Sequence, residues 1–92
     1  MIQNFKHKGL KQLFESGIVK GVNPKHAKRL VNILALLETA ETTDDMDLPG
    51  LKLHQLKGKR KETWAVTVSG NWRTTFKIQN GDALDIDYED YH

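Results

Sequence analysis

The sequence predicts an α+β fold, in which two N-terminal helices pack on a small antiparallel sheet. Apolar residues recur at helical spacing in the first 40 residues, and they alternate with polar residues from residue 51 onward. Two short sequences, Ser69-Gly70-Asn71 and Asn80-Gly81, separate the alternating segments and indicate tight hairpins. Helices followed by an antiparallel meander favour one helical layer on one face of a sheet. A chain of 92 residues is expected to form a single domain, residues 1–92, with one core.

The first half of the chain contains a short strand, predicted over residues 2–5, and two helices. Residues 7–17 place apolar side chains on one helical face, and Gly17 is a typical C-terminal stop. Residues 23–40 form the clearest helix, with Asn23 as its N-cap and proline at its first position. Its predicted apolar stripe consists of Ala27, Leu30, Val31, Ile33, Leu34 and Leu37. A loop over 41–50 follows.

The second half reads as four strands. They are predicted over residues 51–56, 63–68, 72–78 and from Ala83 into the tail, with an exposed basic loop at 57–62. In the third strand, Trp72, Thr74, Phe76 and Ile78 are expected to face the core, while Arg73, Thr75 and Lys77 face outward. In the last strand, Leu84, Ile86 and Tyr88 are predicted to face inward. The same alternation places Asp90 and His92 on their side, just past the core, and Tyr91 on the other.

Charge is segregated along the chain, although the net charge is only +2. Residues 1–37 and 51–77 each carry seven Lys or Arg against one Glu, whereas residues 38–50 and 78–92 each carry five acids and no base. Blocks of this size predict a basic surface for a polyanion, with the acidic segments elsewhere or brought into the site.

Several protein classes are excluded or disfavoured by composition. The chain has no cysteine, so it can form neither a disulfide nor a zinc site with Cys ligands. No apolar run is long enough for a membrane span, and the N-terminus lacks the apolar region of a signal peptide. A cytoplasmic protein without membrane contact is therefore expected.

Candidate chemical groups gather in the second half. A meander can bring the end of one strand, the start of another and the chain's last residues to one sheet face. The candidates are His54, Lys57, Lys59, Arg60, Arg73, Asp90, Tyr91 and His92. This mixture suits RNA cleavage by the 2′-hydroxyl, which needs a base, an acid and cations for the extra negative charge of the phosphorane. Imidazole titrates near neutrality, and fixed Lys and Arg supply charge, so neither a metal nor an organic cofactor is expected.

Plainer readings exist for each group. The final five residues, Tyr88-Glu89-Asp90-Tyr91-His92, can be a solvated acidic tail. Arg73 can be the cross-strand partner of Asp85 or Asp87, and the basic loop a nonspecific phosphate contact. Three of the candidates, His54, Asp90 and His92, can also be zinc ligands, although the neighbouring cations repel a dication. Both Trp64 and Trp72 are expected in the core, and His7 and His26 are expected on helix surfaces without a role.

The second half of the sequence resembles the HigB toxins, a branch of the RelE/ParE superfamily of bacterial toxins. The resemblance rests on residues 51–92, in the pattern L-H-x-L-K-G-x-R, then N-W-R-x-x-F, then D-Y-H at the terminal histidine. The opening MIxxFKHKGLKxLFExG is similar too, and only about residues 18–50 match loosely. Lys59 and Lys61 depart from the pattern, which puts codon preference and ribosome contacts in question.

The resemblance implies a metal-independent, ribosome-dependent mRNA endonuclease with a compact α+β toxin fold. It implies catalytic roles for His54, Asp90, Tyr91 and His92, and RNA binding by Lys57, Arg73 and Asn71, with Lys59 and Arg60 as further phosphate contacts. Strict alternation points Tyr91 away from the site, so a twist or bulge after Tyr88, or stacking of Tyr91 on the RNA, is expected. The implied partners are a helix-turn-helix antitoxin of the HigA type, the ribosome and mRNA, and operator DNA through the antitoxin complex.

Two other functions remain open. Toxins of the ParE type share this superfamily but inhibit gyrase by binding, without a nuclease site. A noncatalytic RNA-binding domain is the third possibility. Two imidazoles and a carboxylate at one edge favour the nuclease, because a pure binder has no need of them.

Overall fold

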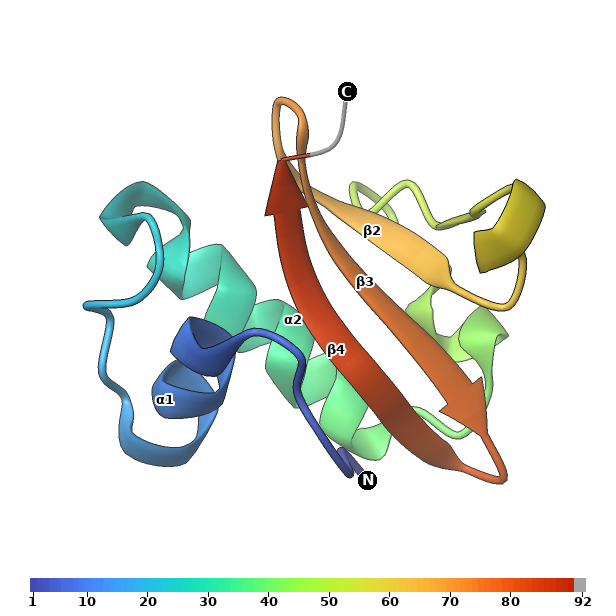
Figure 1. Cartoon of the computed structure of the whole chain (residues 1–92), viewed down its shortest axis with the longest axis horizontal. Coiled ribbons are helices and arrows are strands. Elements are labelled where there is room, and N and C mark those ends of the chain that lie inside the picture. Colours follow the sequence, from blue (N-terminus) through green and yellow to red (C-terminus); the bar gives the residue numbers. More distant parts are fainter. Residues whose placement is uncertain (91–92) are drawn as a thin grey trace.

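The computed structural model describes residues 1–90 (Figure 1). Its regular elements, in chain order, are α1 (Lys8–Ser16), η1 (Pro24–His26), α2 (Ala27–Thr39), η2 (Thr43–Met46), β1 (His54–Gln55), η3 (Gly58–Arg60), β2 (Trp64–Ser69), β3 (Trp72–Gln79) and β4 (Asp82–Asp90), where η denotes a 3-10 turn. The four strands form one antiparallel sheet in the order β1-β2-β3-β4. The predicted α+β fold is confirmed.

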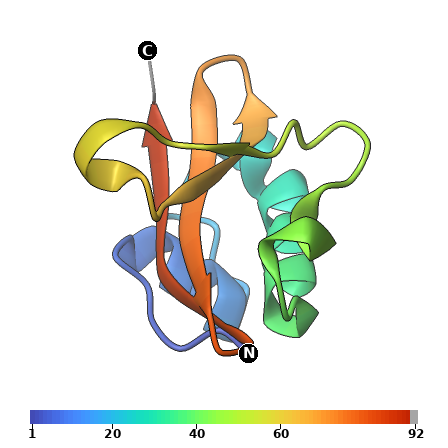
Figure 2. The same cartoon turned by 90° about the vertical axis from the view of Figure 1, so that its right-hand side faces the viewer.

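The sheet has a helix side and an open side. Figure 2 shows α2 and η3 on opposite sides of strands β3 and β4. The core lies between the sheet and the helices, and its largest fully buried apolar side chains are Phe76, Leu10, Leu30, Ile33, Leu34, Leu37, Met46, Ile86 and Val66. Burial of these chains supplies most of the drive for folding, at about 25 cal/mol for each Å² of apolar surface.

Side-chain caps begin α1 and the 3-10 turn that precedes α2. The backbone N–H of Leu10 donates to Nδ1 of His7 at 3.1 Å, so His7 is the N-cap of α1. Gly17 ends this helix with φ = 69°, a left-handed conformation that glycine adopts without strain. Asn23 accepts a bond from the N–H of Lys25 at 3.0 Å and caps η1, which leads into α2. The predicted helix limits are therefore confirmed, with one 3-10 turn at the start of the second.

Three details of the predicted helical half are wrong. Val31 does not join the buried stripe of α2, because its side chain is 47% exposed. His26 is not a surface residue; it is 8% exposed and lies against the end of β4. The loop at 41–50 contains η2, which buries Met46 completely.

The predicted first strand is much shorter than residues 51–56. Only His54 and Gln55 pair with β2, because Lys52 adopts φ = 51° and interrupts the extended backbone. Arg29 of α2 stabilises this region by donating from Nη2 to the carbonyl oxygens of Gly50 at 2.8 Å and Thr67 at 2.9 Å. The short strand begins after this tether.

The alternation predicted for the last strand is wrong at Leu84, because β4 contains a bulge. Thr75 pairs with Asp87 but Lys77 pairs with Leu84, so β4 carries one extra residue, and Asp85 has φ = 52°. Consequently Leu84 pairs on the open side, and Ala83 takes its place in the core together with Ile86 and Tyr88.

The N-terminal segment pins this bulge. Instead of a regular strand, residues 2–5 form two isolated parallel bridges to β4, one of them between Phe5 and Ile86. The side chain of Asn4 accepts from the backbone N–H of Asp85 at 3.1 Å and donates to its carboxylate at 2.8 Å. Asn4 thus satisfies a backbone donor that the bulge withdraws from the ladder.

A close contact between two glycines fixes the loop that joins the helices. A Cβ added to Gly9 would lie 2.3 Å from the carbonyl oxygen of Gly21, and a Cβ at Gly21 would lie 2.7 Å from Cα of Gly9. Both obstacles are backbone atoms, which cannot rotate away. The contact holds the start of α1 against the segment that leads to η1.

Replacing Gly9 by alanine is expected to destabilise the protein, although alanine has a higher helix propensity than glycine. Helix propensity alone would raise the free energy of unfolding by about 1 kcal/mol, whereas overpacking against Gly21 lowers it by roughly 1–3 kcal/mol. Urea denaturation measures the sign. Lys8→Ala, at the neighbouring exposed position, is the control, and a more stable Gly9→Ala protein would contradict the close contact.

Candidate active site on the open face of the sheet

Two rows of paired residues define the open side of the sheet. His54, Ala65, Thr75 and Asp87 lie opposite one another across all four strands, and Thr67, Arg73 and Glu89 form the next row. Paired residues of adjacent strands point to the same face. The central side chains are small, because Ala65 and Thr75 occupy β2 and β3, and larger polar groups stand at both edges. The rows therefore form a shallow polar floor.

His54 stands at the β1 edge of this floor with a defined orientation. Its Nδ1 lies 3.1 Å from the carbonyl oxygen of Lys52. A carbonyl can only accept, so this bond requires a proton on Nδ1 and leaves the lone pair of the neutral ring on Nε2. Lys52 is in the left-handed region, at φ = 51°, and this conformation is what directs its carbonyl toward the imidazole. The Nε2 atom of this exposed ring takes no part in the bond to Lys52.

The basic loop is exposed, as predicted, and one of its side chains ties it to the open side of the sheet. Arg60 of η3 donates to both carboxylate oxygens of Glu89 on β4, from Nη1 at 3.0 Å and from Nη2 at 2.6 Å. The hydroxyl of Thr75 donates to the same carboxylate at 2.8 Å. The bond with Arg60 is the main cause that holds the pKa of Glu89 below its ordinary value, and burial opposes it. Arg60, predicted as a phosphate contact, is therefore also the residue that fixes the loop.

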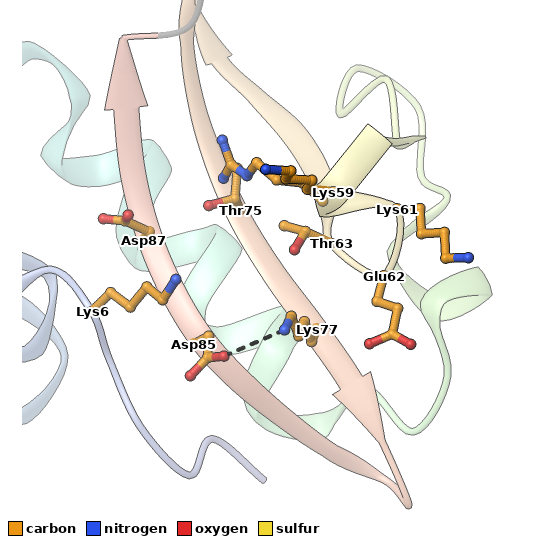
Figure 3. Close-up of a pocket in the computed structure, with 10 residues that line it drawn as sticks. Lys6, Lys59, Lys61, Glu62, Thr63, Thr75, Lys77, Asp85 and Asp87 are labelled. Atoms are coloured by element: carbon orange, nitrogen blue, oxygen red, sulfur yellow. Dashed lines mark ion pairs between the residues drawn. The ribbon is translucent and has the colours of Figure 1, made fainter. Parts of the chain in front are cut away.

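A cavity of about 410 Å³ lies between this loop and the sheet. Figure 3 shows its side chains coming from the N-terminal segment, the loop and the last two strands. Lys6, Lys59, Arg60, Lys61 and Lys77 line it together with Glu62, Asp85 and Asp87. Lys77 and Asp85 form an ion pair at 3.8 Å. Cations outnumber acids in this lining, so the cavity continues the basic surface that the charge pattern predicted.

Arg73 begins β3 and lies at the hairpin end of the floor. Its register partner on β4 is Glu89, so the predicted pairing with Asp85 or Asp87 is wrong. The guanidinium instead donates from Nη1 to the carbonyl oxygens of Gly70, at 2.6 Å, and Trp72, at 3.0 Å. Its Nε is buried and has no hydrogen-bond partner among residues 1–90. Asn71 is exposed in the adjacent turn.

The end of β4 lies beside this hairpin but presents Asp90 to the helix side. Asp90 pairs with Trp72, and the register is regular from Asp87 to Asp90, so no bulge occurs between Tyr88 and Asp90. The structure therefore does not bring Asp90 onto the face that carries His54. Their strands are three spacings apart, roughly 14 Å across the sheet, and Asp90 is offset along β4 from Asp87, which shares the row of His54. Tyr91 and His92 lie outside the described residues.

The remaining predicted residues are exposed on the loop that follows β1. Lys57 precedes η3, and Lys59 lies within it and lines the cavity. Within residues 1–90, no group of three or more His, Asp or Glu side chains is placed to hold a metal ion. The alternative zinc site needs His92 and so extends beyond this part of the chain. No helix within the same range is long and apolar enough to cross a membrane.

The sequence analysis did not name Glu89, Thr75 or Thr67 as residues of the candidate site. Alternation placed Glu89 and Thr75 away from the core, but it could not give their partners, which depend on the bulge in β4 and on the path of the loop. The available signal was the unbroken series of cations at 59–61, which needs an acid nearby if it folds onto the sheet.

The ion pair between Arg60 and Glu89 predicts a pH-dependent contribution to stability. Because the folded pKa of Glu89 is below its ordinary value of 4.5, the contribution is present above that pH and is lost as the pH falls through the folded pKa. The Arg60 side chain is 43% exposed, so the pair is expected to contribute less than about 1 kcal/mol.

Urea denaturation of the wild-type protein and of Glu89→Gln measures this contribution. The difference in unfolding free energy should be largest near neutral pH and should shrink below about pH 4.5. Arg60→Met should behave like Glu89→Gln, and combining the two changes should add little. A difference that is the same at neutral and acidic pH would show that the pair does not form.

The sequence is similar to known proteins over almost its full length. Residues 3–92 match the sequence model of a family described as the RelE-like toxin of the type II toxin-antitoxin system HigB. The chain is also 47% identical, over 92 residues that cover all of both proteins, to a protein of Proteus vulgaris named Endoribonuclease HigB. The resemblance identified in the sequence is thereby confirmed, and the matches extend across the sheet, the basic loop and the terminal residues. This chain belongs to the HigB-like family of RelE-like toxins of type II toxin–antitoxin systems.

Proposed function

We propose that this toxin is a metal-independent endoribonuclease that cleaves mRNA in the decoding site of the ribosome and so stops translation and growth. The proposal draws on the full-length similarity to a protein named as an endoribonuclease. The structural observation that carries it is the open face, where an oriented imidazole and an arginine held at the hairpin lie on the same side of the sheet as a cavity lined mainly by cations. A single RNA strand fits the shallow floor of this face better than a duplex does.

The reaction that this face supports is attack by a 2′-hydroxyl on the neighbouring phosphate. A base removes the 2′-hydroxyl proton, the oxygen bonds to phosphorus, and the bond to the 5′-oxygen breaks as an acid supplies its proton. We assign the two proton transfers to His54 and His92. The Nε2 atom of His54 is available for this role, since its Nδ1 bonds Lys52.

The cations stabilise the negative charge that develops on the phosphorane. We assign this role to Lys57 and Arg73, with Asn71, Lys59 and Arg60 binding the flanking RNA. The guanidinium of Arg73 supports the assignment, because its bonds to the carbonyl oxygens of Gly70 and Trp72 fix the position of its charge before RNA arrives. A cation with its Nη1 held by the hairpin also needs no rearrangement during the reaction.

The terminal residues complete the proposed site. Asp90 lies on the helix side and His54 on the open side, so our assignment does not rest on a contact between these two residues. His92 acts as the acid. Asp90 orients its imidazole ring, and Tyr91 stacks on the RNA.

The family implies an antitoxin as partner. We propose that it is a helix-turn-helix protein of the HigA type, that the complex binds operator DNA through it, and that the toxin acts on ribosomes in the cytoplasm. No part of the mechanism proposed here requires contact with a membrane.

Loss of His92 is expected to remove most of the activity and little of the stability. A proton-transfer group contributes roughly 10²–10⁴ in rate, whereas the last residue of the core is Tyr88. The measurement is single-turnover cleavage of mRNA bound to programmed ribosomes, for the full chain, a chain ending at Tyr91 and His92→Gln. Free mRNA, incubated in parallel, should stay intact.

Lys20→Gln is the control, because it removes an exposed cation that lies outside the cavity and has no assigned role in the chemistry. It should cleave within a few-fold of the wild-type rate. A chain ending at Tyr91 that cleaves at the full rate would rule out His92 as the acid. Equal cleavage of free and ribosome-bound mRNA would rule out ribosome dependence.

A further inference from the structure

The rings of Trp72, His7 and His26 contact the ring of Tyr88 on the helix side of the sheet. Tyr88 stacks on Trp72, with ring centroids 4.6 Å apart and planes inclined by 29°. The imidazoles of His7 and His26 meet Tyr88 edge-on, at centroid distances of 5.3 Å and 6.0 Å. The rings come from the segment before α1, from η1, from β3 and from β4. Tyr88 therefore joins four separate parts of the chain.

One polar bond lies inside this cluster. Nδ1 of His26 and the hydroxyl of Tyr88 are 2.5 Å apart, and both residues are buried. Burial raises the pKa of Tyr88, and a backbone hydrogen bond from Asn23 opposes the rise. The phenol therefore keeps its proton. A hydroxyl can donate or accept, so the bond joins the phenol to Nδ1 of His26 with either imidazole tautomer.

The cluster is the last set of buried contacts before the terminal residues. Tyr88 pairs with Thr74, and only Glu89 and Asp90 follow it in β4. β4 lies at the edge of the sheet, so its end has a ladder partner on one side alone. Strand ends of this kind open more readily than the rest of a sheet. Whatever holds Tyr88 in place therefore also limits opening of the segment from which Asp90, Tyr91 and His92 continue.

We propose that His26 and Tyr88 are positioning residues for the cleavage reaction. Their hydrogen bond anchors the end of β4 and sets the point from which the terminal residues leave the sheet. Neither side chain needs to touch RNA, because both are buried on the helix side. The inference rests on the proposed function, in which Asp90 and His92 take part in the reaction.

Apolar packing alone could hold the ring of Tyr88 against Trp72, but the hydrogen bond to His26 also restricts the orientation of that ring. A phenylalanine at position 88 would keep the stack on Trp72 and most of the burial. The bond to His26 fixes in addition the rotation and height of the ring, since a hydrogen bond has a narrow range of geometry. Loss of the hydroxyl should therefore loosen the strand end more than it loosens the whole fold.

Tyr88→Phe tests the inference with two measurements. Hydrogen exchange of the Glu89 amide, which faces Arg73 of β3, should accelerate roughly 3- to 10-fold, in line with losing one hydrogen bond, and by more than exchange in the centre of β3. Single-turnover cleavage of ribosome-bound mRNA should slow by about the same factor, while the half-saturating toxin concentration stays unchanged.

The control variant is Thr74→Val, which removes a buried hydroxyl from the residue paired with Tyr88. That hydroxyl has no hydrogen-bond partner within residues 1–90, so exchange and cleavage should match the wild-type protein. His26→Leu should reproduce Tyr88→Phe, and the double variant should be no slower than either alone, because both changes break the same bond.

Unchanged exchange and cleavage in Tyr88→Phe would overturn the inference. A uniform rise in exchange across the whole sheet would overturn it too, since it would show a structural role only. If the wild-type protein itself does not cleave ribosome-bound mRNA, the proposed function fails, and the exchange measurement still decides whether the bond anchors the strand end.

Discussion

One extra residue in β4 decides what both faces of the sheet contain. The bulge at Asp85 changes the alternation, so that Ile86 and Tyr88 enter the core while Asp87 and Glu89 face the open side. In a regular strand continued from Ala83, every later side chain would lie on the opposite face. Asn4, 81 residues away in sequence, holds the bulge by bonding both the backbone N–H and the carboxylate of Asp85. The two ends of the described chain therefore set the register together.

The open face follows from that register. Because Glu89 points away from the helices, it can receive Arg60 and draw the basic loop across the strands to the far edge. The loop and the sheet together enclose a cavity. Cations outnumber acids among the side chains that line it. The same register turns Tyr88 toward His26, so the strand that carries the proposed catalytic terminus is fixed from the helix side. Binding surface and anchor are thus two faces of one strand.

Sequence alone predicted the elements better than their contacts. Local signals such as the Asn23 cap, the stop at Gly17 and the turn at Asn80-Gly81 act over a few residues, and the structure confirms them. The bulge at Asp85 was missed because Asn4, distant in sequence, stabilises it. His26 was taken for a surface residue because its partner, Tyr88, lies 62 positions away. Among the site residues, the sequence supplied the residue types, but it could not show that Asp90 and His54 lie on opposite faces.

The central claim is that this face cleaves RNA through the 2′-hydroxyl. The most direct test is the chemistry of the new ends in mRNA cut on purified ribosomes. Attack by the 2′-oxygen leaves a 2′,3′-cyclic phosphate, or the 3′-phosphate formed from it, on one fragment and a 5′-hydroxyl on the other. The account predicts these ends for the wild-type protein and their loss in His92→Gln. Fragments with a 5′-phosphate and a free 3′-hydroxyl would contradict it, because they arise when water attacks the phosphate.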